Sequence, residues 1–121
     1  MARLIMTVDD SASMREMVRA TLQSAGYEVV EAVDGQEALD YARENACDLV
    51  ITDVNMPRMD GITLVSELRG LPHYRLTPLL LLTTESSQER KLEGKRAGAT
   101  GWIVKPFDPA KLIDAIERVT A

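Results

Sequence analysis

Several residue classes that mark secreted, membrane-bound or nucleic-acid-binding proteins are scarce in this sequence. Its 121 residues contain one cysteine, Cys47, so no disulfide can form within the chain, which is typical of a reducing compartment. The longest uninterrupted apolar run, residues 79–82, is far shorter than the roughly 20 residues of a membrane span. No secretory signal pattern opens the chain. We therefore expect a cytoplasmic protein that does not contact a membrane.

Positive charge is also scarce, and this narrows the choice of partners. Lysine and arginine number 14 against 19 aspartates and glutamates, which gives a formal net charge of −5. Nucleic acids and anionic lipid surfaces attract proteins with a basic surface, so neither is an expected partner. The length fits one domain of about 100–150 residues, and we expect residues 1–121 to form a single domain.

Short apolar runs alternate with segments of helical periodicity along the chain. Glu28 and Glu31 interrupt the second run, which favours an exposed edge strand. Ser13 and Glu16 have the spacing of a capping box, which predicts that the first helix begins at Ser13. The alternation predicts an α/β fold with a parallel sheet covered by helices on both faces. Strands are expected at residues 4–8, 27–32, 49–52, 79–82 and 102–104, and helices at residues 13–25, 34–42, 62–68, 87–97 and 109–119.

Polar side chains mark the ends of four of the five predicted strands: Asp9 and Asp10, Asp53, Thr83 and Lys105. Any one of the acids alone suits a helix cap or a turn. As a set they are better explained by the crevice at the carboxyl ends of the strands of a doubly wound sheet. Three carboxylates in that crevice repel one another unless a cation or a raised pKa offsets their charge. Mg²⁺, which binds carboxylate oxygens together with water, is the cation we expect.

Lys105 and Thr83 extend this chemistry to a phosphoryl group. Positive charge neutralises the oxygens of a phosphoryl group during transfer, and a hydroxyl can donate a hydrogen bond to one of them. The predicted site has no Ser–His or Cys–His pair, so a carboxylate is the expected nucleophile. The sequence therefore predicts an aspartyl phosphate.

The chain resembles the receiver domain of two-component response regulators in three stretches: VDDS at residues 8–11, DVNMPRMDG at 53–61 and AGATGWIVKPF at 97–107. The resemblance covers residues 1–121. The last predicted helix reaches the end of the sequence, so we expect no output domain, and the chain looks like the single-domain CheY-type chemotaxis regulators. The resemblance implies a flavodoxin-like receiver fold, with five helices and a doubly wound sheet of five parallel strands in the order 2-1-3-4-5. It also implies a signalling switch that turns over no separate substrate.

The resemblance assigns roles to the polar residues at the strand ends. Asp53 would accept a phosphoryl group from a CheA-like histidine kinase. Asp10 and Asp53 would bind Mg²⁺ through their side chains, Asn55 through its backbone carbonyl, and Asp9 mostly through water. Lys105 would pair with the phosphoryl oxygens, and its peptide bond to the following proline is expected to be cis.

The resemblance also concerns switching and the lifetime of the phosphoryl group. Thr83 would move to hydrogen-bond the phosphoryl group, and Trp102 stands where chemotaxis relatives carry a smaller switch aromatic. Asn55 and Glu85 are the pair found in CheY-type regulators that lose phosphate quickly, so we expect a short-lived phosphoryl group. The active state would present the fourth helix, fifth strand and fifth helix to a downstream protein partner, in chemotaxis or motility.

Other functions share parts of this pattern. A flavodoxin-like cofactor binder needs a phosphate loop after the first strand, where Asp9 and Asp10 would instead repel a phosphate. An Asp-based phosphatase usually carries a second acid two residues after its nucleophile, and here that residue is Asn55. Within the receiver interpretation, a phosphate sink or a non-chemotaxis phosphorelay is the alternative to a chemotaxis output.

Overall fold

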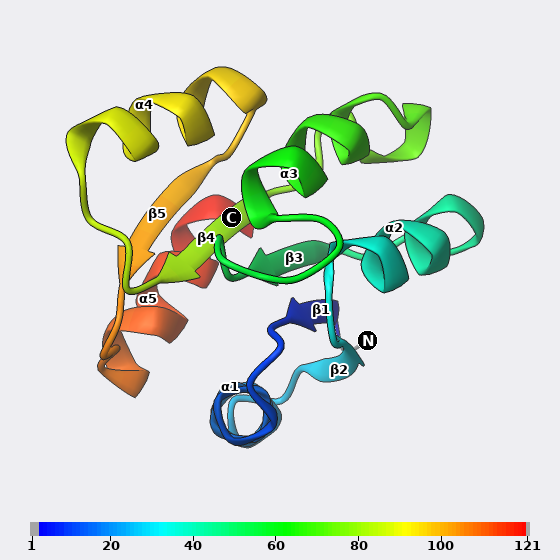
Figure 1. The fold of residues 1–121 in the computed structure, drawn as a ribbon. Helices are drawn as coiled ribbons and strands as arrows, with labels where there is room; N and C mark the ends of the chain where they lie inside the picture. Colours follow the sequence, from blue (N-terminus) through cyan, green and yellow to red (C-terminus); the bar gives the residue numbers. More distant parts are fainter. Residues whose placement is uncertain (1–2, 121) are drawn as a thin grey trace.

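A parallel sheet of five strands lies at the centre of the computed structural model, which describes residues 3–120 (Figure 1). The strands pair in the order β2-β1-β3-β4-β5. This confirms the predicted α/β fold and strand order. Within the described residues, no helix is both long and apolar enough to cross a membrane. The strands are β1 (Leu4–Val8), β2 (Glu28–Ala32), β3 (Leu49–Thr52), β4 (Leu79–Thr83) and β5 (Gly101–Val104), and the helices are α1 (Ala12–Ser24), α2 (Gly35–Glu44), α3 (Gly61–Arg69), the short 3₁₀ helix η1 (Pro72–Tyr74), α4 (Gln88–Ala97) and α5 (Pro109–Thr120).

The sheet separates two apolar cores. Figure 1 shows α2, α3 and α4 over one face of the sheet and α1 and α5 over the other. Successive residues of a strand point to opposite faces. Met6 and Leu81 therefore join the core beneath α2 and α3, whereas Ile5 and Leu80 join the core beneath α1 and α5. Because both faces are covered, the inner strands are nearly continuous apolar runs.

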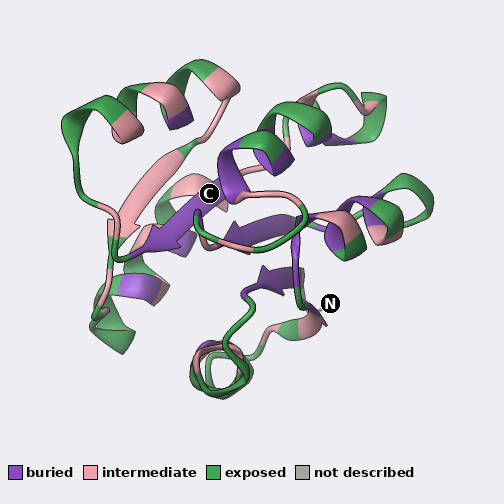
Figure 2. Cartoon of the chain, in the orientation of Figure 1, coloured by how far each residue is buried: buried purple, intermediate pink, exposed green. Residues whose placement is uncertain are grey.

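The two edges of the sheet are more exposed than its centre (Figure 2). β2 is an edge strand, as its two glutamates predicted, and Glu31 pairs with Arg15 and Arg19 of α1. At the other edge β5 is only partly buried, and the neighbouring α4 buries only Gly94. α4 therefore presents a polar surface and packs few of its side chains into the core.

The helix boundaries follow local capping chemistry. The prediction that the first helix begins at Ser13 is wrong, because Ser11 caps α1 and its hydroxyl accepts the Met14 N–H at 3.3 Å. The Asp9 carboxylate accepts the Ser11 N–H at 2.9 Å, which turns the chain into the helix at that point. Asp60 caps α3 in the same way, by accepting the Thr63 N–H at 2.7 Å. Both caps lie on the side of the sheet where the strands end.

Candidate functional site

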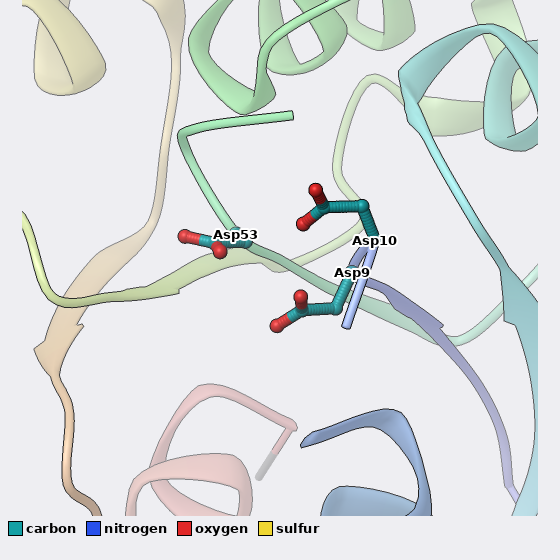
Figure 3. A group of neighbouring side chains, drawn as sticks. All are labelled: Asp9, Asp10 and Asp53. Carbon is teal, nitrogen blue, oxygen red and sulfur yellow. The ribbon is translucent and has the colours of Figure 1, made fainter. Parts of the chain in front are cut away.

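The carboxyl ends of β1 and β3 place three aspartates beside one another (Figure 3). The pairing of Val8 with Thr52 brings the next residues, Asp9 and Asp53, to the same level of the sheet. Asp10 follows directly, and one carboxylate oxygen from each residue lies within 4.8 Å of the others. Asp9 is buried, Asp53 is partly buried and Asp10 is exposed. The group of aspartates is therefore buried on the Asp9 side and open to water on the Asp10 side. We refer to Asp9, Asp10 and Asp53 as the acidic cluster.

Lys105, which follows β5, reaches into the acidic cluster. Its ammonium donates to Asp9 Oδ2 at 2.9 Å and to Asp53 Oδ2 at 3.2 Å, and its side chain is only 9% exposed. Burial disfavours the charged ammonium, but the hydrogen bond to Asp9 and the charge of Asp53 outweigh burial and raise the pKa of Lys105. The peptide bond between Lys105 and Pro106 is cis, as expected. The lysine therefore remains a cation beside the carboxylate predicted to react.

Backbone groups fix the orientation of the Asp53 carboxylate. Its Oδ1 accepts the Val54 N–H at 2.7 Å, while Oδ2 faces Lys105. The chain then folds back, so that the Gly61 N–H donates to the Val54 carbonyl at 2.8 Å. A Cβ at Gly61 would lie 1.9 Å from the Asp53 carbonyl oxygen, so only glycine permits this close approach. Asn55, which lies between these contacts, is exposed.

Thr83, Glu85 and Trp102 are joined by hydrogen bonds. The hydroxyl oxygen of Thr83, fully buried at the end of β4, accepts the Glu85 N–H at 3.2 Å. The Trp102 indole N–H donates to the Glu85 carbonyl at 2.9 Å, and the Glu85 side chain accepts the Ser87 N–H at 3.2 Å. A Cβ on Gly94 would lie 3.0 Å from the Trp102 ring, so the ring packs closely against this glycine. These contacts tie the end of β4 to α4 and β5.

The donor set of the acidic cluster fits Mg²⁺. Lys105 offsets one of the three carboxylate charges, which leaves net negative charge for a cation. All the side-chain donors are hard oxygen atoms, and exposed Asp10 leaves room for the water ligands that Mg²⁺ retains. This cluster is therefore compatible with the predicted magnesium site.

One supporting residue escaped the sequence analysis. The Arg15 guanidinium donates to the backbone carbonyl of Asp9 at 2.6 Å and lies 3.5 Å from the Glu31 carboxylate. It thereby holds the turn that carries Asp9 and Asp10. No local pattern marks Arg15, because its position depends on β2 lying beside β1. The only available signal was a charged residue one helical turn after the cap of α1.

Comparison with known proteins gives consistent matches. The response regulator receiver domain family matches residues 5–117. Chemotaxis protein CheY1 of Helicobacter pylori is 38% identical over 117 residues, which are 95% of this chain and 94% of that protein. The solved structure of Vibrio cholerae chemotaxis protein CheY4 is 51% identical, with a TM-score of 0.94 over 98% of this chain and 99% of that chain.

A third comparison concerns the metal. The receiver domain of a sensor histidine kinase from Pseudomonas aeruginosa is 28% identical to this chain, with a TM-score of 0.92 over 99% of this chain and 98% of that chain. Its structure has a magnesium ion coordinated in the active-site cleft. The similarities thus span nearly the whole chain and include a relative that binds the cation suited to the acidic cluster.

Proposed function

Because the chain belongs to the response regulator receiver family and is similar to chemotaxis regulators, we propose that it is a phosphorylation-dependent switch that accepts a phosphoryl group on Asp53. The donor would be the phosphohistidine of a CheA-like kinase. The observation that carries the proposal is the Lys105 ammonium held between Asp9 and Asp53, beside an exposed Asp10. This arrangement combines a carboxylate nucleophile with positive charge for the incoming oxygens.

The reaction exchanges one phosphorus bond for another. An Asp53 carboxylate oxygen attacks the phosphorus, the phosphorus–nitrogen bond breaks, and the imidazole leaves with the electron pair and takes a proton from water. Lys105 holds the carboxylate in place and offsets charge on the phosphoryl oxygens. Mg²⁺, bound by Asp10, Asp53 and the Asn55 carbonyl and through water by Asp9, would supply further positive charge there.

Loss of the phosphoryl group reverses the state of Asp53. Water attacks the phosphorus, inorganic phosphate leaves, and the carboxylate is regenerated. Asn55, exposed beside Asp53, and Glu85, partly buried after β4, are the residues that would orient this water. Their polar side chains support a short-lived phosphoryl group.

The output would pass through Thr83. A Thr83 hydroxyl that turns to the phosphoryl group gives up the Glu85 N–H, and Glu85 is bonded to Trp102 on β5. The change therefore reaches the face made by α4, β5 and α5, where a downstream partner would bind. α4 carries Arg90, Lys91, Lys95 and Arg96. Lys91 and Lys95 lie beside Trp102 of β5, whereas Arg90 lies 3.8 Å from Asp60 at the cap of α3. The two lysines make an acidic segment of a protein partner the matching chemistry. A partner reads the signal only through different affinities for the two states.

Acetyl phosphate and Mg²⁺ provide the direct test. The wild type should gain one acid-labile phosphate per chain, and Asp53→Asn should gain none. Asp60→Asn is the matched control, because it removes the same charge a few residues along the chain and asparagine remains a good helix cap. Equal phosphate uptake by Asp53→Asn and the wild type would refute the assignment of Asp53.

A further inference from the structure

The loop between β3 and α3, residues 54–60, contains an unusual backbone position. Arg58 has a φ of 65°, and within residues 3–120 it is the sole residue other than glycine with a positive φ. A side chain with a Cβ adopts this left-handed conformation at a cost in energy. Such a conformation persists only where surrounding contacts hold it. The same loop carries Asn55, the backbone ligand proposed for Mg²⁺.

A bidentate ion pair holds the tip of the loop. Arg58 donates from Nε to Asp34 Oδ2 at 2.7 Å and from Nη2 to Asp34 Oδ1 at 3.1 Å. Asp34 is itself fixed, because its side chain is only 7% exposed and it caps α2 by accepting the Glu37 N–H at 2.9 Å. The hydrogen bond from Arg58 lowers the pKa of Asp34. The loop is therefore tied to the start of a helix outside the acidic cluster.

The backbone of the loop also sits directly on α2. A Cβ at Gly35, the first residue of α2, would lie 2.6 Å from the Met59 carbonyl oxygen. The loop is fixed at its start by the Asp53 and Val54 contacts and at its end by Gly61. Asn55 lies between these ends. Beyond it, the Thr52 hydroxyl donates to Met56 Sδ at 3.9 Å, and the Asp34–Arg58 pair restrains the tip of the loop.

We propose that the Asp34–Arg58 ion pair is a positioning clamp for the loop at residues 54–60, and that it sets the place of Asn55 relative to the acidic cluster. Arg58 is thus a positioning residue, since it acts through Asn55 and the loop backbone. The inference rests on the proposed function, because Asn55 matters only if the site binds Mg²⁺ and a phosphoryl group. Mutation of a group that orients a metal ligand commonly lowers metal affinity by about tenfold or more.

The test removes each partner of the Asp34–Arg58 pair in turn and compares the effect with that of removing a second ion pair outside the loop. Arg58→Gln keeps most of the side-chain length and the backbone strain, and Asp34→Asn keeps a residue that caps helices well. Arg43→Gln is the control, because it removes the exposed Arg43–Asp40 pair on the same helix without touching the loop. Each clamp variant should weaken Mg²⁺ binding, measured calorimetrically, by about tenfold, and the double variant should weaken it no further. Arg43→Gln should bind Mg²⁺ as the wild type does.

Amide hydrogen exchange in the metal-free protein gives a second measurement. The amides of residues 54–56, 58 and 59 should exchange faster in Arg58→Gln and Asp34→Asn, whereas the exchange rates of the β3 amides should not change. Arg58→Gly relieves the left-handed strain, so a purely local backbone effect predicts that it retains wild-type Mg²⁺ affinity. The clamp predicts that Arg58→Gly loses Mg²⁺ affinity as Arg58→Gln does. It also predicts that Arg58→Lys, which keeps the positive charge, binds Mg²⁺ more tightly than Arg58→Gln but less tightly than the wild type.

The outcomes separate the two proposals. If Arg58→Gln binds Mg²⁺ as tightly as the wild type and its loop amides exchange at the wild-type rate, the clamp is refuted and the proposed function stands. If the wild type itself binds no Mg²⁺ and gains no phosphate, the proposed function and this inference fail together.

Discussion

Lys105→Met would test the electrostatics that hold the acidic cluster together. Three carboxylates and one ammonium leave two net negative charges there, and the substitution would leave three. The side chains of Lys105 and Asp9 are only 9% and 6% exposed, so water screens their interaction little. Loss of one partner of a buried ion pair costs about 3–5 kcal/mol. Methionine keeps the apolar stem, so we expect the unfolding free energy to fall by about 3 kcal/mol without Mg²⁺.

Mg²⁺ should then stabilise the variant more than it stabilises the wild type. Two unit charges about 5 Å apart interact by about 3 kcal/mol at an effective dielectric constant of about 20, so an ammonium would repel divalent Mg²⁺ by about twice that. Asp10 is exposed, so water reduces this contribution. We therefore expect Mg²⁺ to bind Lys105→Met about tenfold more tightly, which corresponds to about 1.4 kcal/mol. The same variant should gain less phosphate, because the ammonium proposed to face the phosphoryl oxygens is gone.

Urea unfolding followed by Trp102 fluorescence, with and without saturating Mg²⁺, measures both effects. Lys111→Met is the control, since it removes the same charge from an exposed position on α5. It should change neither the stability nor its dependence on Mg²⁺. If Mg²⁺ stabilises Lys105→Met no more than the wild type, the ammonium and the metal do not share one electrostatic site.

Three further predictions follow from other contacts. Gly61→Ala places a Cβ 1.9 Å from the Asp53 carbonyl oxygen. It should lower the unfolding free energy, measured in urea, by about 3 kcal/mol and reduce phosphate uptake. Wild-type stability of this variant would contradict the close approach. Asn55→Arg should slow phosphoryl loss at least about tenfold by removing a group proposed to orient water. An unaltered decay of acid-labile phosphate would contradict the proposed role of Asn55. The Arg58 hydrogen bond lowers the pKa of Asp34, so Asp34 stabilises the fold above its unfolded pKa of about 4 and this stabilisation is lost as pH falls through the lower folded value. On acidification below about pH 4, Arg58→Gln should therefore lose less unfolding free energy than the wild type. Acid unfolding followed by circular dichroism would measure the two losses. Equal losses would exclude the Asp34–Arg58 pair as the cause of this pH dependence.

The elements of the fold were predictable because their signals are local and repeated. Each inner strand is a short apolar run, and the α-helices other than the polar α4 show apolar periodicity with polar residues at their ends. The start of α1 was not predictable, since Ser13 has Glu16 at capping-box spacing, whereas Ser11, the actual cap, is followed at that spacing by Met14. The Asp9 carboxylate, which accepts the Ser11 N–H, decides between them. That contact exists only once the end of β1 is in place.

The gathering of Asp9, Asp10, Asp53 and Lys105 was predictable for a different reason. Parallel strands all end at the same side of a sheet, so residues at those ends lie close whatever the details of packing. The supporting contacts had no such rule. Arg58 and Asp34 are 24 residues apart, and neither follows a strand in a pattern that suggests pairing. Their contact depends on how the loop at residues 54–60 crosses the start of α2, which sequence periodicity does not describe.

The register of the sheet explains why a lysine on an edge strand completes a site on the central strands. Thr52 pairs with Leu81, and Leu82 with Ile103, so Asp53 is level with Ile103 and Lys105 lies two positions further along. β4 separates β3 from β5, and neighbouring strands are about 4.8 Å apart. The residue at position 105 must therefore reach back over the end of β4 to contact Asp9 and Asp53, which requires a long side chain with a charged tip. The Lys105 side chain starts from this end of β4, because the Lys105 N–H donates to the carbonyl of fully buried Thr83 at 2.8 Å.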